Sequence, residues 1–159
     1  MDSTQTLRLY AYRLLAARAY TESELRSKLE QKAKKDGCDA TSVNAILNDL
    51  LSKKWLDDTS VAEQIVTRRG IGHHRKQLTL EQRGLSVDAQ QQAWTQWDRE
   101  QELLELQELI QKYGHRWSSA GPKGYNRAYG FLARRGFSAR DIRTALQRWM
   151  NLDSDAEDQ

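Results

Sequence analysis

Two pairs of adjacent arginines, each directly before a glycine, are the side chains best suited to bind an anion. They are Arg68-Arg69 and Arg134-Arg135. Guanidinium groups hold carboxylates and phosphates through charge-assisted and often bidentate hydrogen bonds. An arginine pair at a helix end also meets the negative end of the helix dipole, which contributes only about 0.3–1 kcal/mol. For the first pair, a role at a helix end and the binding of an anion are therefore both open.

The positive charge of the chain is concentrated in one segment. The net charge is only +3, yet residues 111–150 contain nine basic residues and one acidic residue, which gives this segment a charge of +8. Helix ends do not require so many cations, so contact with an acidic surface or with phosphates is favoured here. The candidate partner-binding residues are Arg68, Arg69, Arg75, Lys76, Arg134, Arg135, Arg140 and Arg143.

Other chemistries find little support in the sequence. His73 and His74 are adjacent and would point to different faces of a helix, so a polar surface explains them better than a metal site. Cys38 is the only cysteine, which excludes an internal disulfide and a four-cysteine zinc site. We find no catalytic set of residues and no phosphate-binding glycine loop. The sequence therefore predicts neither an enzyme nor a protein with a metal or a cofactor.

Aromatic residues interleave with the basic ones and could stack on nucleic-acid bases. Tyr125 and Tyr129 have helical spacing, which favours a place in the core. Trp117 lies in the loop-like stretch 115–124 and is the better candidate for an exposed aromatic side chain. Trp55 and Leu56 are expected to be buried together as an anchor.

The apolar pattern predicts about nine short helices and no strand. Thr21 to Glu24 has the sequence of a capping box, which marks the start of a helix. The acids between residues 98 and 108 are expected on the solvated face of another helix. The clearest apolar stripe, at i, i+3, i+4, i+7 and i+8 of a helix near 41–53, is Val43, Ile46, Leu47, Leu50 and Leu51.

A recurring pattern divides the chain into parts. A helix, then glycine or alanine with an aromatic or aliphatic residue, then another helix occurs at Ala19-Tyr20, Gly70-Ile71 and Gly136-Phe137. Repeated short helices bury one another's apolar faces by stacking, so we expect an all-α, elongated and curved array. The expected parts are a flexible N-terminus at 1–5, repeats at 6–56, 57–98 and 99–150, and an acidic disordered tail at 151–159.

The sequence favours a cytoplasmic location. No apolar run approaches the roughly 18 residues that a membrane span needs. The first residues do not begin a secretory signal. A single cysteine agrees with a reducing compartment.

Three motifs occur in order along the chain. The first is Trp55-Leu56-Asp57-Asp58, followed by Ala62. The residues of the second are Gly70, Gly72, Arg75, Leu80 and Arg83-Gly84-Leu85. The residues of the third are Phe131-Leu132, Arg134-Arg135-Gly136-Phe137-Ser138 and Asp141-Ile142. Together they resemble the RecX family, the regulatory proteins of bacterial recombination.

The chain departs from the pattern of that family at a few positions. Lys54-Trp55 stands where Gly-Tyr is usual, and Val61 replaces an aromatic residue. His73 replaces a frequent proline, and Lys76 falls where an apolar residue is usual. The helix that carries Lys76 also has a weak apolar stripe, so we expect it to be more exposed than the others.

The resemblance implies a fold of three tandem three-helix repeats and a regulatory, non-enzymatic role. It implies binding to the RecA recombinase, above all to its filament on single-stranded DNA, and slower strand exchange and ATP hydrolysis. A monomer is the default expectation, and direct contact with single- or double-stranded DNA stays open. Two alternatives remain. The basic helices on either side of Gly136 could form a helix-turn-helix of a DNA-binding regulator, or the chain could be a passive helical adaptor.

Overall fold

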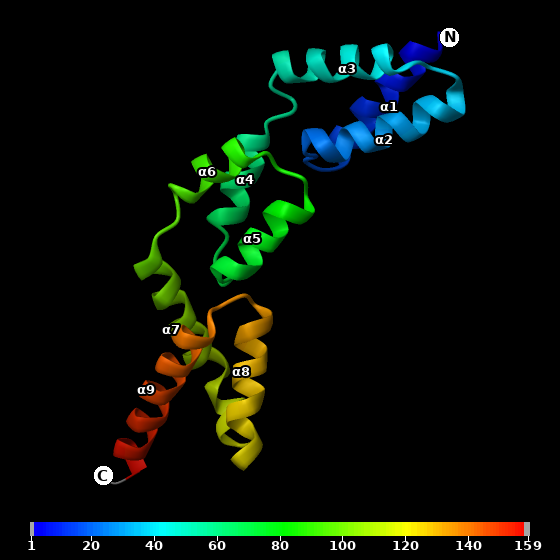
Figure 1. Cartoon of the computed structure of the whole chain (residues 1–159). Helices are drawn as coiled ribbons and strands as arrows, with labels where there is room; N and C mark the ends of the chain where they lie inside the picture. The colour runs from blue at the N-terminus through cyan, green and yellow to red at the C-terminus, as the bar shows by residue number, and fades with distance from the viewer. Residues whose placement is uncertain (1, 158–159) are drawn as a thin grey trace. The chain divides into compact units, whose positions relative to one another are not determined.

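The computed structural model describes residues 2–157, with only the backbone described at 152–154 and 156–157. The helices in chain order are α1 Ser3–Ala17, α2 Glu22–Asp36, α3 Ala40–Ser52, α4 Asp58–Val66, α5 His73–Gln82, α6 Val87–Trp94, α7 Arg99–Ser118, the 3-10 helix η1 Gly121–Lys123, α8 Gly124–Arg134 and α9 Ala139–Glu157 (Figure 1). No strand occurs within the described part of the chain. The prediction of an all-α fold with three consecutive groups of three helices is confirmed.

The helices pack into two compact units. Unit 1 consists of Met1–Ile65 and Leu80–Gln96, and unit 2 consists of Val66–Thr79 and Trp97–Gln159. The middle group of helices, α4 to α6, is therefore divided, and α5 contributes residues to both units. The repeat boundaries at residues 56 and 98 stay predictions from the sequence.

The core of unit 1 lies between α1, α2 and α3. The predicted stripe of α3 is confirmed for its first four members, whereas Leu51 is 37% exposed. The capping box of α2 is also confirmed, because Thr21 Oγ1 accepts from the Glu24 N–H and Glu24 accepts from the Thr21 N–H. The buried residues of this core include Leu7, Ala11, Leu25, Leu29, Ala33, Val43, Ile46, Leu47, Leu50 and Leu56.

The prediction that Trp55 is buried beside Leu56 is wrong. Leu56 is 3% exposed, but Trp55 is 54% exposed. The reason lies in Lys54, which adopts a left-handed conformation (φ 58°) after α3 and turns the chain there. The turn brings Leu56 into the core, while Trp55 lies on the surface with its ring centroid 5.4 Å from that of Tyr12.

The core of unit 2 lies between α7, α8 and α9. Its buried members are Leu106, Ile110, Trp117, Ala128, Leu132, Phe137, Ile142 and Leu146. Trp117 is only 7% exposed, contrary to the prediction, because α7 continues through the stretch expected to be a loop. Tyr125 is 38% exposed rather than buried, because Gly124, Ala128 and Leu132 form the inner stripe of α8 and Tyr125 lies one residue away from it.

The two ends of the described chain are helical. The N-cap of α1 is Asp2, whose side chain accepts from the Thr4 N–H, so α1 begins inside the segment 1–5. At the other end α9 continues to Glu157, into the segment for which disorder was predicted. Residues 158–159 of that segment lie outside the described residues.

Candidate functional site

The basic residues predicted from the sequence all lie in unit 2, but not all reach its surface. Arg68 and Arg69 follow α4 and are exposed, and so is Arg75 on α5. Lys76 is buried, with 4% of its surface exposed. In the third group of helices Arg135 is half-buried, and the exposed residues are Arg134, Arg140 and Arg143.

The two glycine segments that follow the arginine pairs contact each other. The backbone N–H of Gly72 donates to the carbonyl oxygen of Arg135 at 2.8 Å. The N–H of His74 donates to the carbonyl oxygen of Gly136 at 3.1 Å. Segments 64 residues apart in the sequence, at 72 and 136, are thus joined by their backbones, and most of the predicted arginines gather around this junction.

Glycine is required on both sides of this junction. A Cβ atom on Gly72 would lie 2.3 Å from the carbonyl carbon and oxygen of Gly136. A Cβ atom on Gly136 would lie 2.4 Å from the Cβ of Arg75, and Gly136 also has a φ of +94°, which disfavours other residues. The motif residues Gly72 and Gly136 are therefore explained by a close approach of backbones.

Two of the predicted arginines hold this junction together. Arg135 Nη1 donates to the carbonyl oxygen of Gly70 at 3.3 Å, and its guanidinium lies 4.8 Å from the centre of the Phe131 ring. Arg75 Nη1 donates to the carbonyl oxygen of Arg134 at 3.3 Å. Arg69 pairs with Glu108 at 3.2 Å, but both side chains are more than half exposed, so the pair contributes little.

Four of the predicted arginines present their charge to solvent. Within the described chain, no carboxylate pairs with Arg68, Arg134, Arg140 or Arg143. Arg134 and Arg140 flank the α8–α9 turn, and Arg143 lies one turn further along α9. The structure therefore separates arginines that position the junction from arginines that present charge to solvent.

A cluster of buried charges lies beneath the junction, and the sequence did not predict it. Glu102 is 2% exposed and Glu105 is 5% exposed, so the expectation that the acids of α7 lie on a solvated face is wrong for these two. Glu102 Oε2 lies 2.8 Å from His73 Nδ1, and Glu105 Oε2 accepts from the Gly70 N–H at 3.0 Å. These partners satisfy carboxylates that burial would otherwise destabilise.

Lys76 is the cation of this cluster. Burial lowers the pKa of Lys76, and the charges of Glu102 and Glu105 oppose that effect. A lysine is tolerated at this buried position because Glu102 and Glu105 are close enough to stabilise its charge. Lys76 therefore serves the interior of unit 2 and is no candidate for contact with a partner, which corrects the sequence-based assignment.

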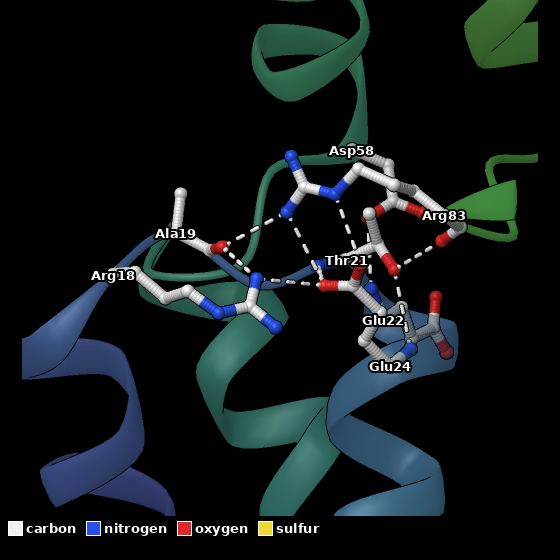
Figure 2. A network of polar contacts seen from close by, with 7 residues as sticks. All are labelled: Arg18, Ala19, Thr21, Glu22, Glu24, Asp58 and Arg83. Atoms are coloured by element: carbon white, nitrogen blue, oxygen red, sulfur yellow. Dashed lines mark hydrogen bonds and ion pairs between the residues drawn. The ribbon is translucent and has the colours of Figure 1, made fainter. Parts of the chain in front are cut away.

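A junction of the same design occurs in unit 1, where Figure 2 shows its polar network. Arg83 Nη2 donates to the carbonyl oxygen of Ala19 at 3.0 Å, as Arg135 does to Gly70. The carbonyl oxygen of Arg83 accepts from Thr21 Oγ1 at 2.7 Å, as that of Arg135 accepts from the Gly72 N–H. The same turn thus occurs twice, at Arg83 and at Arg135. In each case the side chain and the carbonyl group of the arginine both form hydrogen bonds with a turn earlier in the chain.

Carboxylates complete the junction of unit 1. Glu24 accepts from Arg83 Nε at 2.9 Å, and Asp58 accepts from the Glu22 N–H at 2.9 Å (Figure 2). Burial alone would raise the pKa of Glu24, but hydrogen bonds from Arg83 and from the Thr21 N–H outweigh it and hold that pKa below its ordinary value. Burial raises the pKa of Asp58.

The two junctions could have been predicted from one signal in the sequence. Arg83-Gly84-Leu85-Ser86 and Arg135-Gly136-Phe137-Ser138 share the order Arg, Gly, apolar residue, Ser. In each case the glycine has a positive φ and the serine hydroxyl accepts from a backbone N–H of the next helix, at Ala89 and Asp141. In the sequence, Arg83-Gly84-Leu85 stands out only as part of a family motif.

The chemistry of the described surface is that of charge and hydrogen bonding. Among residues 2–157 no three His, Cys, Asp or Glu side chains are grouped so that they could hold a metal ion. In the same range no helix combines the length and the apolar character that crossing a membrane requires. The exposed arginines of unit 2 can bind carboxylates or phosphates.

Comparison with known proteins identifies the family of the chain. The family model described as "RecX, third three-helix domain" matches residues 100–146. The regulatory protein RecX of Deinococcus radiodurans is 36% identical over 148 residues, which cover 92% of this chain and 69% of that protein. The chain belongs to the RecX family. A second RecX, from Chromobacterium violaceum, is 32% identical over 145 residues, with 89% of this chain and 90% of that protein covered.

Solved RecX structures share the fold. A crystal structure of RecX from Lactobacillus salivarius superimposes with a TM-score of 0.73 and 20% identity, over 92% of this chain and 96% of that one. The RecX domain matched at 100–146 includes the α8–α9 turn with Arg134 and Arg135. The junction of unit 2 is therefore partly formed by the segment that the RecX family model matches.

Proposed function

We propose that this chain binds the filament of a RecA-type recombinase and inhibits its ATP hydrolysis and strand exchange. The observation that carries the proposal is membership of the RecX regulatory family. The role is regulatory rather than enzymatic, and we place it in the cytoplasm, with the protein acting as a monomer and without a cofactor.

The exposed arginines of unit 2 are the surface that we assign to the filament. Arg68, Arg134, Arg140 and Arg143 have no carboxylate partner within the described residues and could form charge-assisted hydrogen bonds with carboxylates or phosphates of a filament groove. Backbone hydrogen bonds between the two glycine segments fix the α8–α9 turn beside which two of these arginines lie. A fixed turn loses little conformational entropy when a partner binds.

The assignment is tested with a double variant, Arg134→Glu with Arg140→Glu, in a co-sedimentation assay with the recombinase assembled on single-stranded DNA. We expect filament binding to be lost. Arg140 lies in the first turn of α9, where a glutamate interacts favourably with the helix dipole, so this half of the variant does not weaken the fold.

The matched control is Arg127→Glu combined with Arg116→Glu, which changes the charge equally at exposed positions of α8 and α7 away from the turn. Binding should survive in the control. Equal loss in both variants would mean that net charge alone drives the association. Unchanged binding of the first variant would contradict the assigned surface. Sequence-selective binding of duplex DNA, without effect on the recombinase, would favour the helix-turn-helix regulator instead.

A further inference from the structure

A small, mainly apolar pocket lies between α7 and α9, two helices of unit 2 that are labelled in Figure 1. Its volume is about 170 Å³. We call it the Trp149 pocket. None of the eight candidate partner-binding residues is among the described residues that line it. Those residues are Gln107, Ile110, Gln111, Ala145, Arg148 and Trp149.

The apolar wall of the Trp149 pocket is held in place by the core of unit 2. A Cβ atom on Gly114 would lie 2.9 Å from Cζ2 of Trp149, so the indole ring lies directly on the backbone of α7. The same ring packs edge-to-face on that of Trp117, with 6.4 Å between the ring centroids. Ile110, which is 2% exposed, and the half-buried Ala145 supply the aliphatic part of the wall. The pocket is therefore formed before any ligand arrives.

The rim of the Trp149 pocket is polar and has no partner in the fold. Gln107, Gln111 and Arg148 are exposed, and within the described residues none of them makes a hydrogen bond or an ion pair. The two glutamines are one helical turn apart, so their amide groups lie on the same side of α7. Among the described lining residues there is one cation and no carboxylate, so the rim carries a positive charge.

The size of the pocket fits one apolar side chain. A dry apolar cavity of about 150 Å³ is large enough to hold benzene, so 170 Å³ accommodates one six-membered ring or one branched aliphatic group. A nucleic-acid base fits this lining less well. Its polar edge would meet the side chains of Ile110 and Ala145, which offer no hydrogen bond, and a buried polar group without a partner is costly.

Arg148 indicates that the ligand also carries a carboxylate. A guanidinium group binds a planar carboxylate through two parallel hydrogen bonds. One arginine balances the single charge of a carboxylate, whereas a phosphate monoester carries a charge of about −1.5 to −2 near neutral pH. Because Arg148 and Trp149 are adjacent and line the same pocket, the carboxylate and the apolar group must also be close together in the ligand.

The C-terminal residue of a polypeptide has both groups on one carbon atom. Its α-carboxylate is attached to the same Cα as its side chain, so an apolar side chain in the pocket brings the carboxylate to the rim. An acidic residue next to an apolar one inside an extended chain does not do so, because successive side chains point to opposite faces.

We propose that the Trp149 pocket binds the C-terminal residue of a partner polypeptide, with its apolar side chain in the pocket and its α-carboxylate on Arg148. The amides of Gln107 and Gln111 form hydrogen bonds with the last peptide group. This binding goes beyond the function proposed above. It needs no filament and uses none of the arginines assigned to the filament, so either proposal can fail without the other.

The test uses a fluorescein-labelled peptide of glycine and serine that ends in phenylalanine with a free carboxylate. Fluorescence polarisation measures its binding to the full chain. Replacing the terminal carboxylate by an amide should weaken binding by about tenfold or more, as expected for the loss of hydrogen bonds between charged groups. Arg148→Gln should weaken binding of the acid to the same extent. In that variant the acid and the amide should bind equally, because the carboxylate has lost its partner.

A second variant tests the apolar part of the pocket. Ala145→Leu fills the space beside Trp149, so binding of the phenylalanine peptide should be lost, and circular dichroism establishes that the variant is folded. The matched control for Arg148→Gln is Arg127→Gln. Arg127 is exposed on α8, lies outside the pocket and carries the same charge. The control should bind the peptide as the unmodified chain does.

Three results would overturn the proposal. The first is equal binding of the acid and the amide by the unmodified chain, and the second is an equal loss of binding in Arg148→Gln and Arg127→Gln. The third is competition by polyglutamate or by an oligothymidylate as strong as that by the unlabelled phenylalanine peptide. The site would then recognise acidic side chains or nucleic acid rather than the end of a polypeptide.

Discussion

The junction of unit 2 makes a specific prediction about Gly72. In Gly72→Ala the new Cβ would lie 2.3 Å from the carbonyl carbon and oxygen of Gly136 and from the N atom of Phe137. These are backbone atoms, which cannot rotate away as a flexible side chain could. The two glycine segments must therefore separate, which breaks the hydrogen bonds from the N–H groups of Gly72 and His74, at 2.8 and 3.1 Å.

The expected cost follows from these contacts. Overpacking costs about 1–3 kcal/mol. Loss of the two backbone hydrogen bonds costs about 0.5–1.5 kcal/mol each. Replacing glycine by alanine regains about 0.4–1 kcal/mol from the lower entropy of the unfolded chain. Gly72→Ala should therefore lower the free energy of unfolding by about 1–5.6 kcal/mol, a large share of the total for a small unit.

Urea denaturation followed by tryptophan fluorescence measures this change, and amide hydrogen exchange at residues 72 and 74 locates it. The matched control is Gly130→Ala, inside α8, where a Cβ atom would meet only the end of the Arg134 side chain at 3.2 Å. The control should gain about 0.5–1 kcal/mol, because alanine is the better helix former. If Gly72→Ala were as stable as the unmodified chain and kept its amide protection, the account of the junction would be wrong.

The same structure makes three further predictions. Arg83→Lys removes the guanidinium group that donates to Ala19 and Glu24, so the free energy of unfolding measured by urea denaturation should fall by about 1–3 kcal/mol. The control Arg68→Lys, on the surface, should change it by less than about 0.5 kcal/mol. Equal effects of the two substitutions would contradict the role of Arg83 in the junction of unit 1. Because the pKa of Glu24 is lowered in the fold, its contribution to stability is lost as the pH falls from 4.5 through the lower folded pKa. Glu24→Gln should flatten the acid side of the stability profile, and an unaltered profile would refute the assignment. Because burial lowers the pKa of Lys76, the unfolded state binds protons more tightly, and stability should rise with pH in the window below 10.5. Lys76→Met should abolish that rise in denaturation at several pH values, and an identical slope in both proteins would show that Lys76 does not titrate in this way.

The helices and much of the core could be predicted because their signals are local. The apolar stripe of α3 and the capping box at Thr21 depend on residues within two turns of each other. Such patterns determine which side of a helix is buried whatever the rest of the chain does. The family motifs likewise marked Gly72 and Gly136, although not the reason for them.

The buried charges could not be predicted because their partners are distant in the sequence. Glu105 is satisfied by the backbone of Gly70, and Glu102 by His73, across 35 and 29 residues. The sequence around these two glutamates does not indicate that they are buried. The prediction that Lys76 binds a partner fails for the same reason. A lysine next to an arginine is expected to be exposed unless the buried carboxylates that contact it are known.

The misplaced aromatic residues have a more local cause. One residue in a left-handed conformation, Lys54, decides that Leu56 rather than Trp55 faces the core. The extension of α7 to Ser118 decides that Trp117 is buried. Errors of a few residues in the end of a helix are enough to reverse the exposure of a side chain.

The central claim is that this RecX-family chain restrains a recombinase filament. Its most direct test is ATP hydrolysis by the RecA-type recombinase from the same organism on single-stranded DNA, with the chain titrated to well below one molecule per recombinase subunit. We predict that ATP turnover falls at these low ratios. With the variant Arg134→Glu, Arg140→Glu turnover should stay at the uninhibited rate, whereas the control variant Arg127→Glu, Arg116→Glu should still lower it. Turnover that stays constant up to one chain per subunit would contradict the claim.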